Sequence, residues 1–192
     1  AADHESRVTL QQIEEASRKA KELANQLITF SKGGLPVMVP GAIGRLVFLS
    51  VQSAVGEANI RCQFKLDPAL CPVAFDESQI RRVMINIVRN AIDAMPDGGT
   101  IVIAGSNQIL GPDGSQTGLM LPEGPYVRLS VRDEGPGIPD SHLPQIFDPY
   151  FSTKGKGTDK GTGLGLAITH SIVTQHGGGI HVVPKNSAGG AT

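Results

Sequence analysis

The stretch Tyr126-Val127-Arg128-Leu129-Ser130-Val131-Arg132-Asp133-Glu134-Gly135-Pro136-Gly137-Ile138 decides the fold, because it joins a strand pattern to a glycine-rich turn. Alternate positions from 127 to 131 are apolar and predict a strand with one face toward the core. Asp133 has the same parity, so its carboxylate is expected to point the same way. Such a carboxylate needs hydrogen-bond donors, and Gly135 and Gly137 would let a ligand approach the backbone closely.

The Asp133 carboxylate is an acceptor only, which restricts the ligands it could hold. It would suit the exocyclic amino group of adenine and would repel the carbonyl oxygen of guanine. The alternative is that Asp133 ends the strand and caps a turn.

A helix is predicted upstream, where Asp76-Glu77-Ser78-Gln79 resembles a capping box with Asp76 as N-cap. The helix is expected to run to about Met95. Asn86 and Asn90 lie four residues apart at the rim of its apolar face, with Asp93 alongside. They could be amides satisfied at the boundary of the core, or oxygen ligands for a hard cation such as Mg²⁺.

A glycine-rich motif precedes the next predicted helix, which is expected to end before Gly177. The motif is Gly161-Thr162-Gly163-Leu164-Gly165-Leu166. Glycines at a helix start expose backbone N–H groups, and the helix dipole favours an anion there. The pattern is neither a Walker P-loop nor a Rossmann turn. The polar segment 152–160 predicts a mobile lid, whose Lys154 and Lys156 either reach phosphate or remain solvated.

The remaining segments complete an α+β pattern. A helix is expected from about Arg45 to Gly56, and strands at 60–66 and 100–104. Residues 105–125 are rich in Gly and Pro and predict a long surface connection. Residues 7–30 carry a heptad-like apolar stripe, which fits a helix of a packed pair or an ordinary amphipathic helix. Gly33, Gly34 and Pro36 then mark a domain boundary.

Composition excludes several classes of function. Lys and Arg number 17 against 18 Asp and Glu, so the net charge of -1 leaves no basic surplus for a nucleic-acid partner. The 2 cysteines form neither a disulfide framework nor a metal motif, and we interpret them as thiols in a reducing compartment. Neither a signal peptide nor a membrane span is evident, so we expect a cytoplasmic segment without direct membrane contact. A longer parent protein could still be anchored elsewhere.

The motifs together resemble the catalytic, ATP-binding domain of bacterial sensor histidine kinases, within the superfamily of gyrase, Hsp90-type chaperones, these kinases and MutL. Residues 86–91 resemble the N box, residues 133–138 the G1 box, residues 146–154 the F box and residues 161–166 the G2 box. The resemblance covers residues 76–180. It implies a two-layer α/β sandwich of the Bergerat type, with a mixed sheet and helices on one face, preceded by an N-terminal helix.

The resemblance also implies a ligand, Mg-ATP, and roles for individual residues. Asn90 would ligate Mg²⁺, with Asn86 near the γ-phosphate, and Asp133 would hold the adenine amino group. Lys154 would act with Asn86 in catalysis. The further nucleotide-binding positions would be Asp93, Gly135, Gly137, Ile138, Phe147, Gly161, Thr162, Gly163, Leu164, Gly165, Leu166 and Thr192.

Two departures from the family pattern bear on activity. Superfamily members that hydrolyse ATP usually carry Glu at the position of Asn86, and Asn is a feeble base, so transfer to a protein is favoured over hydrolysis. The second departure is that His4 lacks the sequence context of a phosphorylated histidine. We therefore interpret residues 1–33 as the second helix of a dimerisation hairpin without its acceptor helix. Residues 34–192 would be the catalytic domain, without the strand that normally follows Thr192.

The predicted function is transfer of the γ-phosphoryl group of Mg-ATP to a His on the dimerisation domain, and then to an Asp of a response regulator. The full-length protein would be a homodimer. One alternative is a nucleotide-sensing or partner-docking module without phosphotransfer. Another is a serine-directed kinase of the anti-sigma type.

Overall fold

The structure, a computed structural model, describes residues 35–111, 119, 121–153, 162–185 and 189–192. All of these except Leu35 belong to one compact unit, Pro36–Thr192. The predictions for residues 1–33, including His4, lie outside the described residues. So do those for Lys154, Lys156 and Gly161. In the described part of the chain, no helix has the length and apolarity that crossing a bilayer requires.

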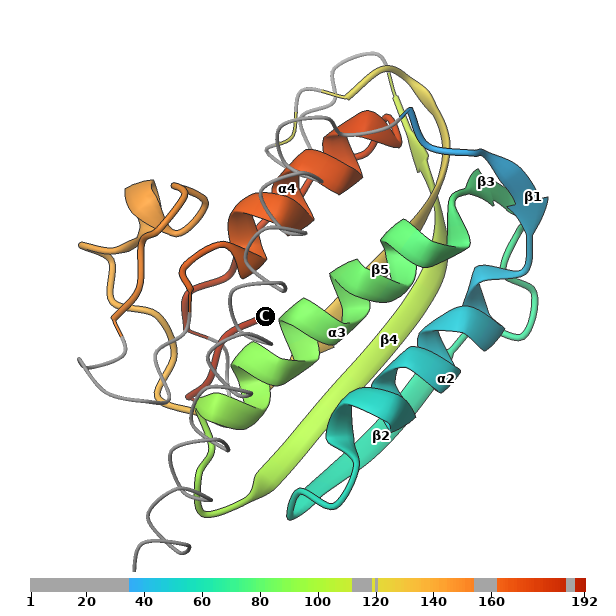
Figure 1. Ribbon diagram of the computed structural model, residues 1–192. Coiled ribbons are helices and arrows are strands. Elements are labelled where there is room, and N and C mark those ends of the chain that lie inside the picture. Colours follow the sequence, from blue (N-terminus) through green and yellow to red (C-terminus); the bar gives the residue numbers. More distant parts are fainter. Residues whose placement is uncertain (1–34, 112–118, 120, 154–161, 186–188) are drawn as a thin grey trace, which may run out of the picture. The chain divides into compact units, whose positions relative to one another are not determined.

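A mixed sheet and three helices form the two layers of this unit (Figure 1). The strands are β2 (Ile60–Leu66), β4 (Gly99–Leu110) and β5 (Gly124–Arg132), in the order β2-β4-β5. β2 is parallel to β4, and β5 is antiparallel to β4. The helices α2 (Ile43–Val55), α3 (Glu77–Asp93) and α4 (Gly165–Gln175) lie over one face, which confirms the predicted fold class.

Three short elements complete the fold. β1 (Val39–Gly41) and β3 (Val73–Phe75) pair antiparallel as a separate two-stranded sheet. The single-turn helix η1 (Leu143–Gln145) lies between β5 and α4. Neither short strand was predicted, since three residues are too few for an alternating pattern to stand out.

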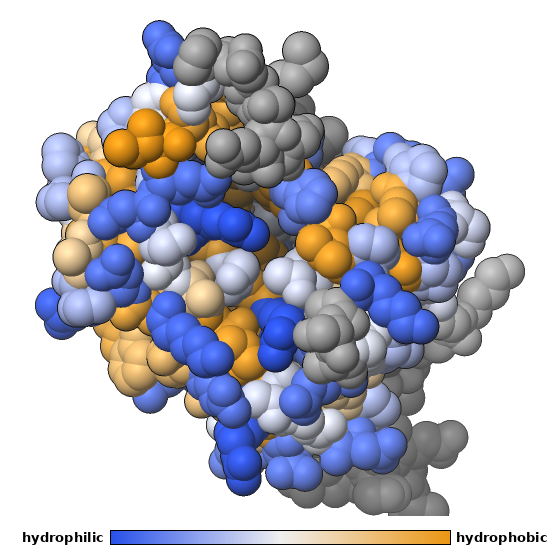
Figure 2. All heavy atoms as spheres, turned by 180° about the vertical axis from the view of Figure 1, so that it is seen from behind, coloured by the Kyte–Doolittle hydropathy of each residue, from blue (hydrophilic) through white to orange (hydrophobic). Residues whose placement is uncertain are grey.

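The core lies between the helices and one face of the sheet. Its most buried side chains come from α2, β4, α3 and the start of α4, and include Val47, Val51, Val88, Ile101, Ile103 and Leu164. Along β2 burial alternates at every residue, so that Arg61, Gln63 and Lys65 are exposed on the other face. Seen from behind the helices, that side of the molecule carries many hydrophilic side chains (Figure 2).

β4 extends to Leu110, so the prediction of a surface connection from Gly105 onward was wrong for its first six residues. Gly105 is a packing position: a Cβ there would lie 2.9 Å from Leu66 Cδ2 and 3.2 Å from Leu129 Cδ2. The glycine therefore makes room for the leucines of two neighbouring strands.

α3 begins as predicted, with Asp76 as N-cap. Its Oδ1 accepts a hydrogen bond from the Gln79 N–H at 3.1 Å. The second half of the predicted capping box was wrong, because the Asp76 N–H donates to His176 Nε2 at 3.0 Å instead of to the Gln79 side chain. Asp76 Oδ2 also accepts from the Val37 N–H at 3.1 Å. Hydrogen bonds from the Ser78 hydroxyl and from these backbone groups lower the pKa of Asp76.

The lowered pKa predicts a dependence of stability on pH. The charged Asp76 stabilises the folded chain fully above its unfolded pKa, about 3.9, and this stabilisation is lost as pH falls through the lower folded pKa. Asp76→Asn retains a capping side chain without the charge. We therefore expect the wild type to exceed Asp76→Asn in free energy of unfolding at pH 7, and the difference to shrink below about pH 4. Urea unfolding at several pH values measures it, and a difference constant from pH 7 to pH 3 would contradict this assignment.

Candidate functional site

The amide of Asn86 joins α3 to the start of α4. Its Nδ2 donates to the Gly165 carbonyl oxygen at 3.1 Å and lies 3.5 Å from Thr169 Oγ1, and the Thr169 side chain is fully buried. Asn86 thus has the polar partners that an Asn at the rim of an apolar helix face requires. This contact brings the N-box helix beside the G2 segment, as the predicted site requires.

Asn90, one turn further along α3, is half-buried, and its amide differs from that of Asn86 in its hydrogen bonding. Among the described residues, its side chain makes no hydrogen bond. The amide oxygen of Asn90 is a suitable ligand for a hard cation, because such cations prefer oxygen ligands. Asp93, in the last turn of α3, is exposed.

Asp133 lies directly after β5 and is 9% exposed. Its Oδ1 accepts hydrogen bonds from the Gly135 N–H at 2.9 Å and the Ala191 N–H at 3.2 Å. Its own N–H donates to the Ala191 carbonyl at 3.1 Å. The carboxylate points inward, as predicted, and it also caps the turn that follows. Its contact with a ligand remains a prediction.

Glycines around Asp133 allow this close packing. A Cβ on Gly135 would lie 3.0 Å from Asp133 Oδ1 and 3.1 Å from the Ala94 Cβ, just beyond α3. A Cβ on Gly190 would collide with the Asp133 carboxylate and backbone. Only Gly fits at position 190. Because Gly135 approaches Ala94, the G1 turn lies against the carboxyl-terminal end of the helix that bears Asn86 and Asn90.

The second glycine of the turn, Gly137, adopts a φ of +78°, and a Cβ there would lie 2.6 Å from the Pro184 carbonyl oxygen. The next residue, Ile138, donates its N–H to the same oxygen at 2.8 Å. Val183 and Thr192 exchange two backbone hydrogen bonds, of 2.9 and 3.0 Å. The turn is thereby fixed to the last described segments of the chain.

The G2 segment leads into α4 through a tight turn. Gly163 has a φ of +66°, and a Cβ there would collide with the backbone of Tyr150. The Tyr150 N–H donates to the Gly163 carbonyl at 3.0 Å. The Leu164 N–H lies 3.4 Å from Thr162 Oγ1, and the Leu164 side chain is buried in the core. Gly165 and Leu166 follow in the first turn of α4.

Phe147, in the predicted F box, packs against α4. Its ring centroid lies 5.1 Å from that of His170. The aromatic residue therefore connects the segment before the predicted lid to the helix after it. Its contact with the nucleotide stays a prediction.

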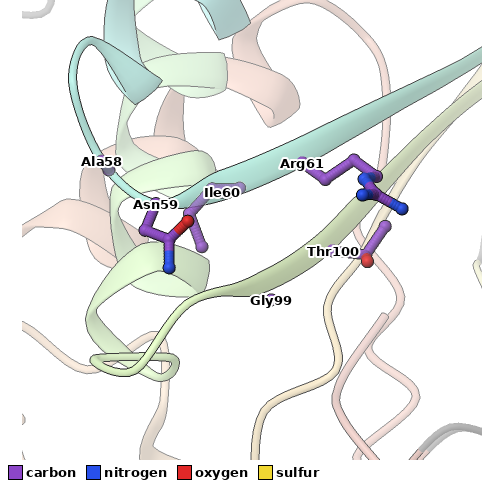
Figure 3. A pocket seen from close by; sticks show the side chains of 6 residues that line it. All are labelled: Ala58, Asn59, Ile60, Arg61, Gly99 and Thr100. Atoms are coloured by element: carbon purple, nitrogen blue, oxygen red, sulfur yellow. The ribbon is translucent and has the colours of Figure 1, made fainter.

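A separate hollow lies at the start of β2 and β4 (Figure 3). Its lining residues are Ala58, Asn59, Ile60, Arg61, Gly99 and Thr100. None of them is a predicted site residue, so this hollow is not the candidate site. The Thr100 N–H donates to Glu134 Oε2 at 2.9 Å, so the residue next to Asp133 contacts the start of β4.

Sequence reasoning missed Thr169, Ala191 and His176, which contact Asn86, Asp133 and Asp76 respectively. The His-Gly-Gly stretch directly after a helix was the available signal for His176. Nothing in the sequence alone pairs Thr169 or Ala191 with its partner.

Comparisons with known proteins agree with this arrangement. Residues 75–192 match the family model described as "Histidine kinase-, DNA gyrase B-, and HSP90-like ATPase". The sensor kinase CckA of Brucella abortus is 34% identical over 174 residues, which are 88% of this chain and 18% of CckA. The chain thus spans about a fifth of the length of such curated relatives, sporulation kinase A of Bacillus subtilis included (19%).

Solved structures show the same fold. The catalytic domain of histidine kinase ThkA is 29% identical with a TM-score of 0.56, covering 72% of this chain and 81% of that chain. ThkA in complex with the response regulator protein TrrA gives a TM-score of 0.65 at 24% identity, covering 93% of this chain and 47% of that one. The family match spans the Asn86, Asp133 and Gly163 segments that the structure brings together. This chain is therefore a member of the histidine kinase-, DNA gyrase B- and HSP90-like ATPase family.

Proposed function

We propose that this chain binds Mg-ATP and is the catalytic domain of a two-component sensor histidine kinase. The observation that carries the proposal is the buried Asp133, whose Oδ1 is held by two backbone N–H groups. A carboxylate oriented in this way offers a fixed acceptor for the amino group of adenine. Gly135, Gly137 and Ile138 would line the adenine end, and Thr192 would assist there.

The phosphate end would lie along α3 toward α4. Asn90 would hold Mg²⁺ through its amide oxygen, and the cation would neutralise charge on the phosphates. The backbone N–H groups from Gly163 to Leu166 would face the phosphates at the positive end of the α4 dipole. The remaining predicted contacts would come from Asp93, Phe147, Lys154, Gly161 and Thr162.

Asn86 supports transfer to a protein rather than to water. Its amide donates to the Gly165 carbonyl, and an amide oxygen is too weak a base to activate water. Catalysis would then rest on positioning, to which Asn86 and the backbone amides would contribute, and on charge neutralisation by Lys154 and the cation that Asn90 would hold. The acceptor would be a His on a dimerisation helix of the homodimeric parent protein. From there the phosphoryl group would pass to an Asp of a response regulator. This step is supported by the solved structure of ThkA in complex with the response regulator protein TrrA.

Phosphotransfer is tested with two polypeptides. The chain alone is expected not to label itself from γ-labelled ATP, whereas an added dimerisation fragment from its parent, carrying the acceptor His, is expected to become labelled. The label should be acid-labile, as phosphohistidine is, and should be absent when that His is replaced by Gln.

Three results would contradict the proposal. Label on His4 of the chain itself would show that the acceptor is present here. ATP binding without label on the fragment would support a nucleotide-sensing module, and acid-stable label on serine would support a serine-directed kinase.

A further inference from the structure

His176 follows the last residue of α4 and contacts two helices at once. Its Nδ1 lies 2.8 Å from the carbonyl oxygen of Ile172, in the preceding turn of α4. Its Nε2 lies 3.0 Å from the backbone nitrogen of Asp76, 100 positions away in sequence. Gly177, at a φ of +71°, ends the helix directly afterwards. The imidazole therefore joins the end of α4 to the N-cap of α3.

The two partners of His176 fix the state of its ring. A carbonyl oxygen can only accept a hydrogen bond, so Nδ1 must carry the hydrogen. A backbone N–H can only donate, so Nε2 must present its lone pair. Only the neutral Nδ1–H tautomer satisfies both contacts, and the link between the helices depends on the acceptor at Nε2.

A second link joins the same helices at the other end of α4. There the Asn86 amide donates to the Gly165 carbonyl in the first turn of the helix. The N-terminal end of α3 thus meets the C-terminal end of α4, so the two helices run antiparallel (Figure 1). α4 has 11 residues and is about 16 Å long. Polar links near both of its ends restrict pivoting about the apolar contacts between them.

We propose that His176 is a positioning residue for nucleotide binding, an inference that rests on the proposed function. Through Asp76 it fixes the direction of α4 against α3. It thereby holds the backbone N–H groups at the start of α4 beside Asn86 and Asn90, where the phosphates would bind. His176 lies at the opposite end of α4 and touches no phosphate itself.

Two matched variants separate this role from a merely structural one. In His176→Asn the amide nitrogen takes the place of Nδ1 and can still donate to the Ile172 carbonyl, but no acceptor reaches Asp76. In His176→Gln the longer side chain brings an amide oxygen to the position of Nε2, where it can accept from the Asp76 N–H. Both replacements are polar and uncharged.

The measured quantity is the ratio of the affinities for Mg-ADP and for adenosine. Calorimetry gives the affinity for Mg-ADP, and ligand-observed NMR gives the affinity for adenosine. His176→Asn is expected to weaken Mg-ADP binding about fivefold, the effect of one hydrogen bond. Adenosine binding should stay unchanged, since Asp133 lies beyond the far end of α3. His176→Gln is expected to restore the wild-type ratio.

Several outcomes would overturn the inference. One is a wild-type ratio of affinities in His176→Asn, and another is an equal loss of affinity for Mg-ADP and adenosine in that variant. The third is a ratio in His176→Gln that stays at the value of His176→Asn. Nitrogen-15 NMR of the wild type tests it without any variant, because an Nε2–H tautomer or a charged ring at pH 7.5 excludes the contact with Asp76. A wild-type chain that binds neither ligand would instead refute the proposed function itself.

Discussion

Asp133→Asn is expected to lower the affinity for ATP by about 1–3 kcal/mol, or roughly 5- to 150-fold, while the chain stays folded. This magnitude is that of losing one buried hydrogen bond, between the Asp133 carboxylate and the adenine amino group, and placing two donors opposite each other instead. The substitution replaces one carboxylate oxygen by an NH2 group and preserves the side-chain volume.

The geometry around Asp133 explains why the fold should survive. Oδ1 accepts two backbone N–H groups, from Gly135 and Ala191, and an Asn oxygen can accept both in the same place. The Asn amino group must then occupy the position of Oδ2. There it would face the adenine amino group donor to donor, whereas it could donate to the carbonyl oxygen of guanine. The preference for ATP over GTP should therefore fall together with ATP affinity.

Calorimetric titrations of ATP and GTP, with thermal unfolding in parallel, measure this effect. Glu134→Gln is the matched control, because the neighbouring exposed carboxylate contacts the Thr100 N–H and an amide oxygen can replace it. Wild-type ATP affinity in Asp133→Asn would refute the assignment of Asp133 to adenine.

Local patterns made much of the fold predictable. The strand at Ile60–Leu66 was predicted with its observed bounds, because its alternation is uninterrupted. Asp76 was predicted as an N-cap, since its carboxylate and the Gln79 N–H are only three positions apart. In both cases the interactions that decide the structure lie within a few residues of each other.

Predictions failed where distant residues decide the conformation. Gly105 was interpreted as the start of a loop, but it continues β4 because Leu66 and Leu129 occupy the space of its missing side chain. A capping box at residues 76–79 implies a bond from the Asp76 N–H to the Gln79 side chain, yet this N–H bonds His176, whose position depends on how α4 packs. No local propensity encodes such contacts.

The candidate site shows the same division. The inward direction of Asp133 follows from strand parity, and burial of its side chain confirmed it. The donors that hold it include Ala191, 58 positions away, and the partner of Asn86 is Gly165, 79 positions away. The sequence motifs therefore selected segments that the structure brings together, while the hydrogen bonds between these segments are seen only in the folded structure.

Asn90→Ala is expected to abolish the Mg²⁺ dependence of ATP binding and to reduce phosphoryl transfer by about 100-fold or more, because a catalytic cation stabilises the transition state by several kcal/mol. The fold should be retained for two reasons. Among the described residues the Asn90 side chain makes no hydrogen bond, and Ala is a better helix former than Asn. The midpoint of thermal unfolding without nucleotide should be unchanged or slightly higher.

The measurement is a comparison of ATP affinity with Mg²⁺ and with EDTA, together with transfer to the dimerisation fragment. Arg89→Ala is the matched control, since this exposed neighbour on α3 leaves the apolar face and both asparagines intact. In wild type and Arg89→Ala, Mg²⁺ should tighten ATP binding, whereas in Asn90→Ala the two affinities should coincide at the metal-free value. An Asn90→Ala chain whose ATP affinity still rises with Mg²⁺, and which transfers at the wild-type rate, would show that another residue holds the cation.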